Sequence, residues 1–451
     1  MRNRLTAIWL TLLVACAPVQ QDRAIPTRAP SIMQDLPPMK AFAPTPLVPP
    51  TRANAEIARD FLDLSFRMES GKPLPIMTRF DGPITVRVVG EATDSLVSDL
   101  HALLTRLRRE AGINILMTDA EDASITVETV PQRTLQRAVP RAACFVVPRI
   151  SSWAEFRRSG RSDAVDWSTL ERREKATVFL PSDAAPQEVR DCLHEELAQA
   201  IGPLNDLYRL PDSVFNDDNI HTVLTGFDML ILRAYYAPEM RNGMTEAEAT
   251  EAIPGVLARL NPAGQLRRPK ARTGTSREWI DAMNIALSAG PNADRRRRAA
   301  QNAIMMGDQS GWTGPRQGFA YYAYGRLEIS NDPDRALQAF NAAETLYGQS
   351  TTTEIHAAHI AVQKAAFALA AGDAEATLAL VDEAIPVARQ HQNAALLATL
   401  MMFKAEALEM SGNATAARAV RMDSLGWARY GFGADRNVQA RLIEIASLRP
   451  F

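Results

Sequence analysis

The pattern of apolar and polar residues between positions 52 and 261 predicts a domain of mixed strands and helices. A helix is expected over residues 54–68, and a strand over residues 84–89, where β-branched residues alternate with others. Thr93 can cap a helix that runs to Glu110, because leucines recur there at helical spacing. Apolar runs then predict strands over residues 113–117, 124–128, 144–147 and 176–180, and a helix over residues 185–201 that ends at Gly202.

From residue 276 to about 430 the pattern predicts helices only, in repeated pairs. Turn-like residues recur at 290–292, 331–333, 372–373 and 412–413, a spacing of about 40 residues, and each turn separates an apolar helix from an Ala-rich one. This period predicts an all-α solenoid. The second unit resembles a tetratricopeptide repeat, since small and aromatic residues stand at Gly325, Ala336, Phe340 and Ala343. Residues 431–451 are expected to form a C-terminal tail.

The N-terminus is typical of an exported lipoprotein. Arg2 and Arg4 precede a short apolar run over residues 5–14, which is too short to span a bilayer. Leu13-Val-Ala-Cys16 then reads as a lipobox, so residues 1–16 are predicted as signal peptide and lipobox, with Cys16 lipidated. Ala17 follows, which favours the outer membrane, facing the periplasm, over inner-membrane retention. The alternatives are an uncleaved helix or an ordinary secretory signal.

Two segments of low complexity separate these parts. Residues 17–51 are rich in Pro, Ala and Gln and are expected to form a disordered tether, while residues 262–275 form a linker whose basic residues are most simply solvated. The net charge of −2 gives no indication of a nucleic-acid partner. Outside the cytoplasm Cys144 and Cys192 are expected to form a disulfide; two separate buried thiols are the alternative.

Candidate chemistry lies in residues 194–206, which read His-Glu-Glu-Leu-Ala-Gln-Ala-Ile-Gly-Pro-Leu-Asn-Asp. This segment resembles the zinc-binding segment of metzincin metalloproteases, H-E-x-x-H-x-x-G-x-x-H, in which three His bind zinc and the Glu is the general base. Alignment on Gly202 puts Glu195, Gln199 and Asn205 at the three ligand positions. It puts Glu196 at the general-base position and Asp206 at an acidic position that follows the motif.

The departures from this pattern change the expected chemistry. None of the ligand positions holds His, and Glu, Gln and Asn form a poor zinc site. His194 does not restore the motif, because a shift of one residue puts Ala198 at the second ligand position. We therefore expect a degenerate metzincin-like domain with no metal and no cofactor. The alternatives are activity with another ion, or a polar network of these side chains that pins the helix exit to residues 215–218.

The resemblance continues downstream. Residues 224–236 are similar to the helix that closes matrixin-like domains, with Thr225 at its start and Asp228 within it, while residues 212–217 take the place of the Met-turn without its Met. Together with the run 215–218 and Gly243-Met-Thr, these motifs resemble an uncharacterised bacterial lipoprotein family, domain of unknown function 2927, over residues 55–260. That resemblance implies no known activity.

Three hypotheses follow for the function. The first is a non-catalytic envelope lipoprotein, anchored to the membrane by its lipid, whose helical repeats bind a protein or peptide. The second is a metal-dependent, peptidase-like hydrolase with atypical ligands and Glu196 as general base. In the third, the first domain serves only as a cap for the helical repeats.

Overall fold

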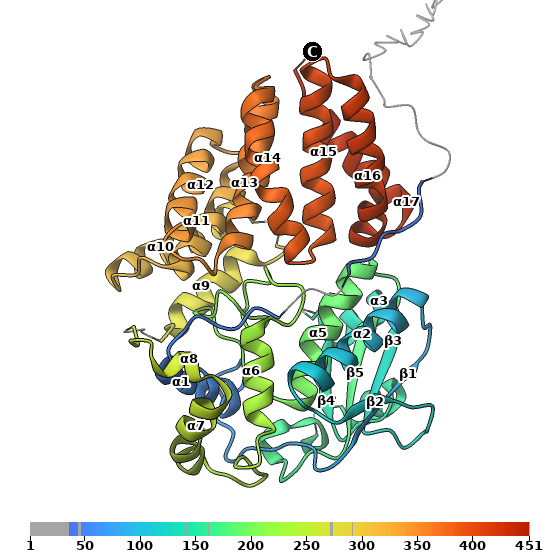
Figure 1. The fold of residues 1–451 in the computed structure, drawn as a ribbon, viewed down its shortest axis with the longest axis vertical. Coiled ribbons are helices and arrows are strands. Elements are labelled where there is room, and N and C mark those ends of the chain that lie inside the picture. The colour runs from blue at the N-terminus through green and yellow to red at the C-terminus, as the bar shows by residue number, and fades with distance from the viewer. Residues whose placement is uncertain are drawn as a thin grey trace, which may run out of the picture. The chain divides into compact units, whose positions relative to one another are not determined.

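The computed structural model describes residues 36–43, 47–140, 142–160, 162–270, 274–290 and 292–450. Within these residues a first region of mixed strands and helices precedes a region of helices alone (Figure 1). No helix in the described ranges combines the length and apolarity needed to cross a membrane. Cys16 and the predicted signal peptide lie outside the described residues.

A five-stranded sheet with strand order β2-β1-β3-β5-β4 forms the centre of the first region. Neighbouring strands run parallel except at one edge, where β4 is antiparallel to β5. The five predicted strands are confirmed, with ends that differ by one or two residues at most. Their bounds are β1 Ile84–Val89, β2 Ile115–Met117, β3 Ile125–Val130, β4 Phe145–Pro148 and β5 Ala176–Pro181.

Helices cover both faces of this sheet. Residues of β5 alternate between the two faces: Val178 and Leu180 join the main core with α2 and α5, whereas Phe179 packs with Leu135 of α3 and Phe156 of α4. The pattern did not predict α3 and α4, which have only seven residues each. The helices of this region are α1 Asn54–Ser65, α2 Asp94–Glu110, α3 Gln132–Ala138, α4 Trp153–Ser159, α5 Pro186–Ile201, α6 Gly226–Tyr235, α7 Glu246–Leu260 and α8 Pro262–Gln265.

Two local predictions for this region are confirmed. The Oγ1 of Thr93 accepts a hydrogen bond from the Leu96 N–H at 3.2 Å, which caps α2. Cys144 and Cys192 form a disulfide that joins the start of β4 to α5, across a sequence separation of 48 residues. The bridge therefore fixes the antiparallel edge strand to the helix that carries the candidate site.

The second region contains α9 to α17 (Figure 1). The predicted turns lie where expected, and each supplies the N-cap of the next helix: the side chains of Asn292, Asp332, Asp373 and Asn413 accept hydrogen bonds from backbone N–H groups three residues further on. The helices are α9 Arg277–Leu287, α10 Ala293–Gln309, α11 Pro315–Glu328, α12 Pro333–Tyr347, α13 Glu354–Ala370, α14 Ala374–Gln390, α15 Ala394–Met410, α16 Ala414–Phe432 and α17 Asp435–Ala446.

Small residues allow these helices to approach closely. A Cβ added at Gly325 of α11 would lie 2.7 Å from a ring carbon of Phe340 on α12, and Ala336, Phe340 and Ala343 are completely buried. Gly325 and Phe340 therefore pack against each other between α11 and α12, and Ala336 and Ala343 lie in the same buried core.

Three expectations about the connecting segments need correction. Residues 36–43 were expected to be disordered tether but make defined contacts with α16. The expected linker 262–275 begins with the short helix α8, and its Lys270 is tied to α1 by a hydrogen bond from its N–H to Glu56 at 3.0 Å. The expected tail contains α17, which packs on α15 and α16 through buried apolar residues such as Val438.

Candidate functional site

The end of α5 positions the candidate residues, and a buried arginine holds that end in place. Arg173, 3% exposed, donates hydrogen bonds to the carbonyls of Gln199, Ala200 and Gly202 at 2.5–2.8 Å. It thereby satisfies carbonyl groups that a helix end leaves without partners and stabilises the negative end of the helix dipole. A glycine stands at position 202 because a side chain there would collide with Leu232: an added Cβ would lie 2.6 Å from it. The backbone of Gly202 does not adopt a left-handed conformation.

Four carboxyl groups gather beside this helix end: Glu69, Glu195, Asp206 and Asp217, which we call the acidic cluster. Gln199 links two of them, because its Nε2 donates to Glu69 at 3.5 Å and to Asp206 at 3.4 Å. Burial raises the pKa of Glu195 to about 7 and that of Asp217 to about 6, and in both cases the charge of Glu69 adds to the effect.

Burial also raises the pKa of Glu69 and raises that of Asp206 well above its ordinary value. Because like charges this close cannot all ionise, the cluster retains protons at neutral pH. A protonated carboxyl group can donate a hydrogen bond or a proton, so the cluster has the elements of an acid–base site.

Of the other two candidate positions, Asn205 turns away from the acidic cluster and Glu196 borders it. The Nδ2 of Asn205 donates to the carbonyl of Asp63 at 2.9 Å, which ties the segment after α5 to α1. Glu196 is 6% exposed, and burial together with the charges of Glu195 and Glu69 raises its pKa well above its ordinary value. The structure therefore brings Glu195, Gln199 and Asp206 together, with Glu196 close enough for the cluster's charges to act on it, whereas Asn205 turns to α1.

No group of three or more His, Cys, Asp or Glu side chains in the described ranges could hold a metal ion. His194 is buried, and its Nδ1 accepts a hydrogen bond from the Leu224 N–H at 3.1 Å, so it anchors the chain before α6. Burial holds the pKa of His194 well below its ordinary value, which keeps the ring neutral.

Asp228 of α6, singled out by the matrixin resemblance, organises the loop that faces the acidic cluster. Its completely buried carboxylate accepts hydrogen bonds from the N–H groups of Val214 at 3.1 Å and Thr225 at 2.7 Å. The Leu207 N–H donates to the Phe215 carbonyl at 2.9 Å. The loop that carries Asp217 is therefore fixed both to α6 and to the segment after α5.

Sequence reasoning missed Glu69 as a member of the site and did not separate Asp217 from its acidic neighbours. Glu69 follows α1, more than a hundred residues before α5, and stands in no motif. Asp217 lies within the run 215–218 that the family resemblance singled out, so the signal existed but was not specific.

A second group of titratable residues lies where the first region meets the helical region. His221 and Asp218 come from the first region, and His356, His359 and His391 come from α13 and the residue after α14. The rings of His221 and His391 are 5.5 Å apart, and His356 bonds to Asp218 at 3.0 Å. Burial lowers the pKa of His359 to about 4 and that of His391 to about 3.

Direct hydrogen bonds hold the two regions together next to these histidines. The Nε2 of Gln187 on α5 donates to Asn393 Oδ1 at 3.1 Å, and its Oε1 accepts from the Ala395 N–H at 2.9 Å. Thus Gln187 contacts both the N-cap residue and the first turn of α15. The boundary between the regions is a packed interface.

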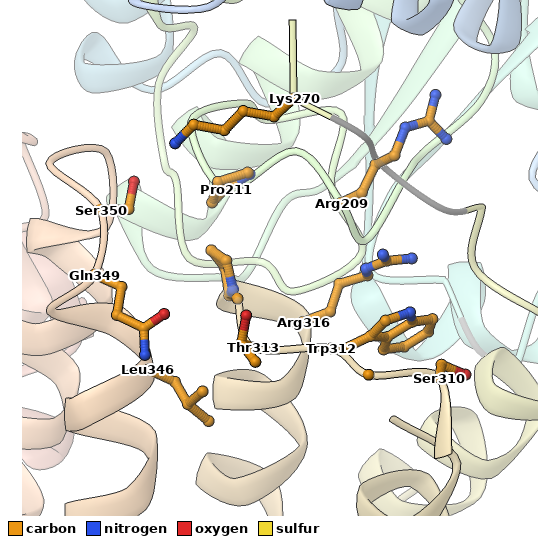
Figure 2. A pocket seen from close by; sticks show the side chains of 13 residues that line it. Arg209, Pro211, Lys270, Ser310, Trp312, Thr313, Arg316, Leu346, Gln349 and Ser350 are labelled. Carbon is orange, nitrogen blue, oxygen red and sulfur yellow. The ribbon is translucent and has the colours of Figure 1, made fainter. Parts of the chain in front are cut away.

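A cavity of about 360 Å³ opens between the linker side of the first region and the helical region (Figure 2). Lys270 and Arg209 lie on one wall, and Trp312 of the α10–α11 loop and Arg316 at the start of α11 lie on the other. The guanidinium of Arg316 is 3.7 Å from the centre of the Trp312 ring and donates to Thr275 at 2.9 Å. None of the described residues that line the cavity is acidic, so it suits an anionic ligand.

Comparison with known proteins gives one family match. Residues 54–255 match the model of a family described as a protein of unknown function, DUF2927. No curated protein matches the chain, and no solved structure does either. The match covers the first region, including α5 and the acidic cluster, and leaves the helical region unmatched.

Proposed function

We propose that this protein is a lipoprotein of the bacterial envelope, anchored by lipid at Cys16, that binds a protein or peptide without catalysing a reaction. In this proposal residues 52–261 are a metzincin-like domain that has lost zinc, and the helical region is a tetratricopeptide-like array. The location is the periplasmic face of the outer membrane.

The arrangement at the end of α5 and directly after it carries this proposal. Of the three positions that would hold zinc in a metzincin, Glu195 and Gln199 join a network of carboxyl groups and Asn205 bonds to the backbone of α1. A metalloprotease needs neutral imidazoles or similar strong donors at these positions, together with an open coordination site. The parallel sheet with one antiparallel edge strand, followed by α5, supports the metzincin-like origin.

Two features support a binding role. Arrays of helix pairs bury one face of each pair and leave another available to a partner. The cavity beside Trp312 and Lys270 adds an aromatic and basic surface at the edge of this array. The hydrogen bonds of Gln187 support an accessory role of the first region as a cap, because they tie it to α15.

Metal analysis and cross-linking test the proposal. Purified full-length protein should contain no stoichiometric zinc, and Glu196→Gln should leave every phenotype unchanged. Cross-links formed in detergent-solubilised envelopes should join a partner to residues 277–446. Stoichiometric metal, or cross-links no more abundant than those of an unrelated lipoprotein, would count against it.

One observation favours hydrolysis as a second candidate. The acidic cluster combines a carboxyl group whose pKa lies near 7, Glu195, with an ionisable neighbour, Asp217, whose pKa lies near 6. Such a pair can act as acid and base without a metal. Hydrolysis of peptides or cell wall that is lost in Glu195→Gln and retained in Glu196→Gln would establish this candidate over the first.

A further inference from the structure

Residues 36–43 lie as a bound peptide along α16. The N–H of Lys40 donates to the carbonyl of Gly426 at 3.0 Å, and Arg429 donates to the carbonyl of Pro37 at 3.0 Å. The ammonium group of Lys40 also pairs with the carboxylate of Asp423. Backbone and side-chain bonds therefore hold the segment at several points along its length.

Phe42 anchors this segment. Its ring stacks on Trp427 at 4.5 Å between centroids and meets the edge of Tyr430 at 6.5 Å. Arg190 of α5 lies 5.4 Å from the centre of the same ring. An aromatic side chain enclosed by two rings and a guanidinium is the usual form of an energetically dominant contact in peptide recognition.

The surface of α16 is shaped for this occupant. A Cβ added at Gly426 would lie 3.1 Å from the carbonyl oxygen of Pro38 and 2.9 Å from Lys40 Cγ. Glycine weakens a helix interior, but here it lets the two backbones approach closely enough to bond. Asp423, Gly426, Trp427 and Tyr430 lie at helical spacings of three and four residues, so they share one face.

We propose that this face of α16 is a binding site for an extended, proline-containing peptide with a basic residue two positions before an aromatic residue, and that residues 36–43 occupy it in cis as an autoinhibitory segment. The basic residue of a partner would meet Asp423 and its aromatic ring would meet Trp427. The inference rests on the proposed function in that the helical region must bind a peptide partner, which displaces the segment.

The test uses the full-length chain in detergent, a lysine-specific protease and a fluorescent peptide of residues 36–43. Wild-type protein should resist cleavage at Lys40 and bind little peptide. Phe42→Ala should be cleaved there about tenfold faster or more, since each ~1.4 kcal/mol of lost binding is a factor of ten, and should bind the peptide in trans. Met39→Ala, which changes an exposed residue of the same segment, should behave as the wild type.

Gly426→Leu separates the site from its occupant. Its new side chain would meet atoms of Pro38 and Lys40, so cleavage at Lys40 should accelerate while no peptide binds. Equal cleavage of wild type and Phe42→Ala, or a Phe42→Ala protein that binds no peptide, would overturn the inference. Neither result affects cross-links elsewhere in residues 277–446, so the two proposals fail separately.

Discussion

The first region buries more charged side chains than the helical region, which buries Glu328 and Glu406 but is packed mainly from alanines and aromatic rings. Arg173 is nearly inaccessible in the first region, and so is the ion pair of Arg52 with Asp60. The completely buried residues of α12 are Ala336, Phe340 and Ala343. The difference indicates that buried polar interactions stabilise the first region, whereas close packing of small and aromatic side chains stabilises the helical region.

The largest effect is expected at Arg173. Arg173→Leu leaves the carbonyls at the end of α5 without donors and should lower the free energy of unfolding by about 3–5 kcal/mol. Arg172→Leu, an exposed neighbour, should change it by less than about 0.5 kcal/mol. Urea denaturation at neutral pH measures both. Equal urea midpoints for the two variants would show that the hydrogen bonds of Arg173 do not stabilise the first region.

The disulfide should rank next. Replacing Cys144 and Cys192 by Ala should cost about 3–4 kcal/mol, because the bridge closes a loop of 48 residues in the unfolded chain. Addition of a reductant should lower the urea midpoint of the wild type to that of the variant and leave the variant unchanged. A reductant effect on the variant would point to another cause.

In the helical region the sensitive property should be volume. Gly325→Val would bring new atoms against Phe340 and should cost about 1–3 kcal/mol. Gly255→Val adds the same atoms in α7, where a Cβ has open space, and should leave the thermal midpoint nearly unchanged. If the two variants melt alike, close helix packing is not what limits the helical region.

The histidines should make the boundary sensitive to acid. The pKa of His359 is lowered to about 4 by burial, with His356, Arg326 and His221 adding to the effect and Asp218 opposing it. The contribution of neutral His359 to the free energy of unfolding is thus present above the ordinary pKa near 6.5 and is lost as the pH falls toward 4.

Between pH 7.5 and 5 the free energy of unfolding of the wild type should therefore fall by about 2 kcal/mol because of His359. The corresponding fall in His359→Phe should be smaller by about 2 kcal/mol. His101→Phe, which changes an exposed histidine, should follow the wild-type curve. Urea denaturation at the two pH values measures these changes. An equal fall in the free energy of unfolding for His359→Phe and the wild type would refute the prediction.

The acidic cluster should respond to pH in the opposite direction. Because the pKa of Glu195 is raised from 4.5 to about 7, the contribution of its protonated form to the free energy of unfolding is present below pH 4.5 and is lost as the pH rises through 7. Glu195→Gln should therefore be more stable than the wild type at pH 6 by about 2 kcal/mol and equal to it at pH 4. Glu239→Gln, which removes an exposed carboxylate whose pKa is lowered by Arg259, should not gain stability over the wild type as the pH rises.

Local patterns were enough to predict most elements, one helix cap and the turns of the helical region. The strand Ile84–Val89, the cap at Thr93 and the turns at residues 331–333 and 372–373 depend on residues within a few positions of one another. The same is true of the repeat period, which comes from turn residues at regular spacing. Patterns of this kind fail for α3 and α4, which are too short to show a clear period.

The sequence by itself therefore determined the order of the five strands, the disulfide partners and the absence of histidine from the aligned ligand positions, since these need only neighbouring residues or residue identity. Only the tertiary structure decided that Glu69 joins Glu195, that Asn205 turns to α1, and that Phe42 binds Trp427. Such contacts join residues far apart in the chain. The pKa values that follow depend on burial and neighbouring charge, which exist only once the chain has packed.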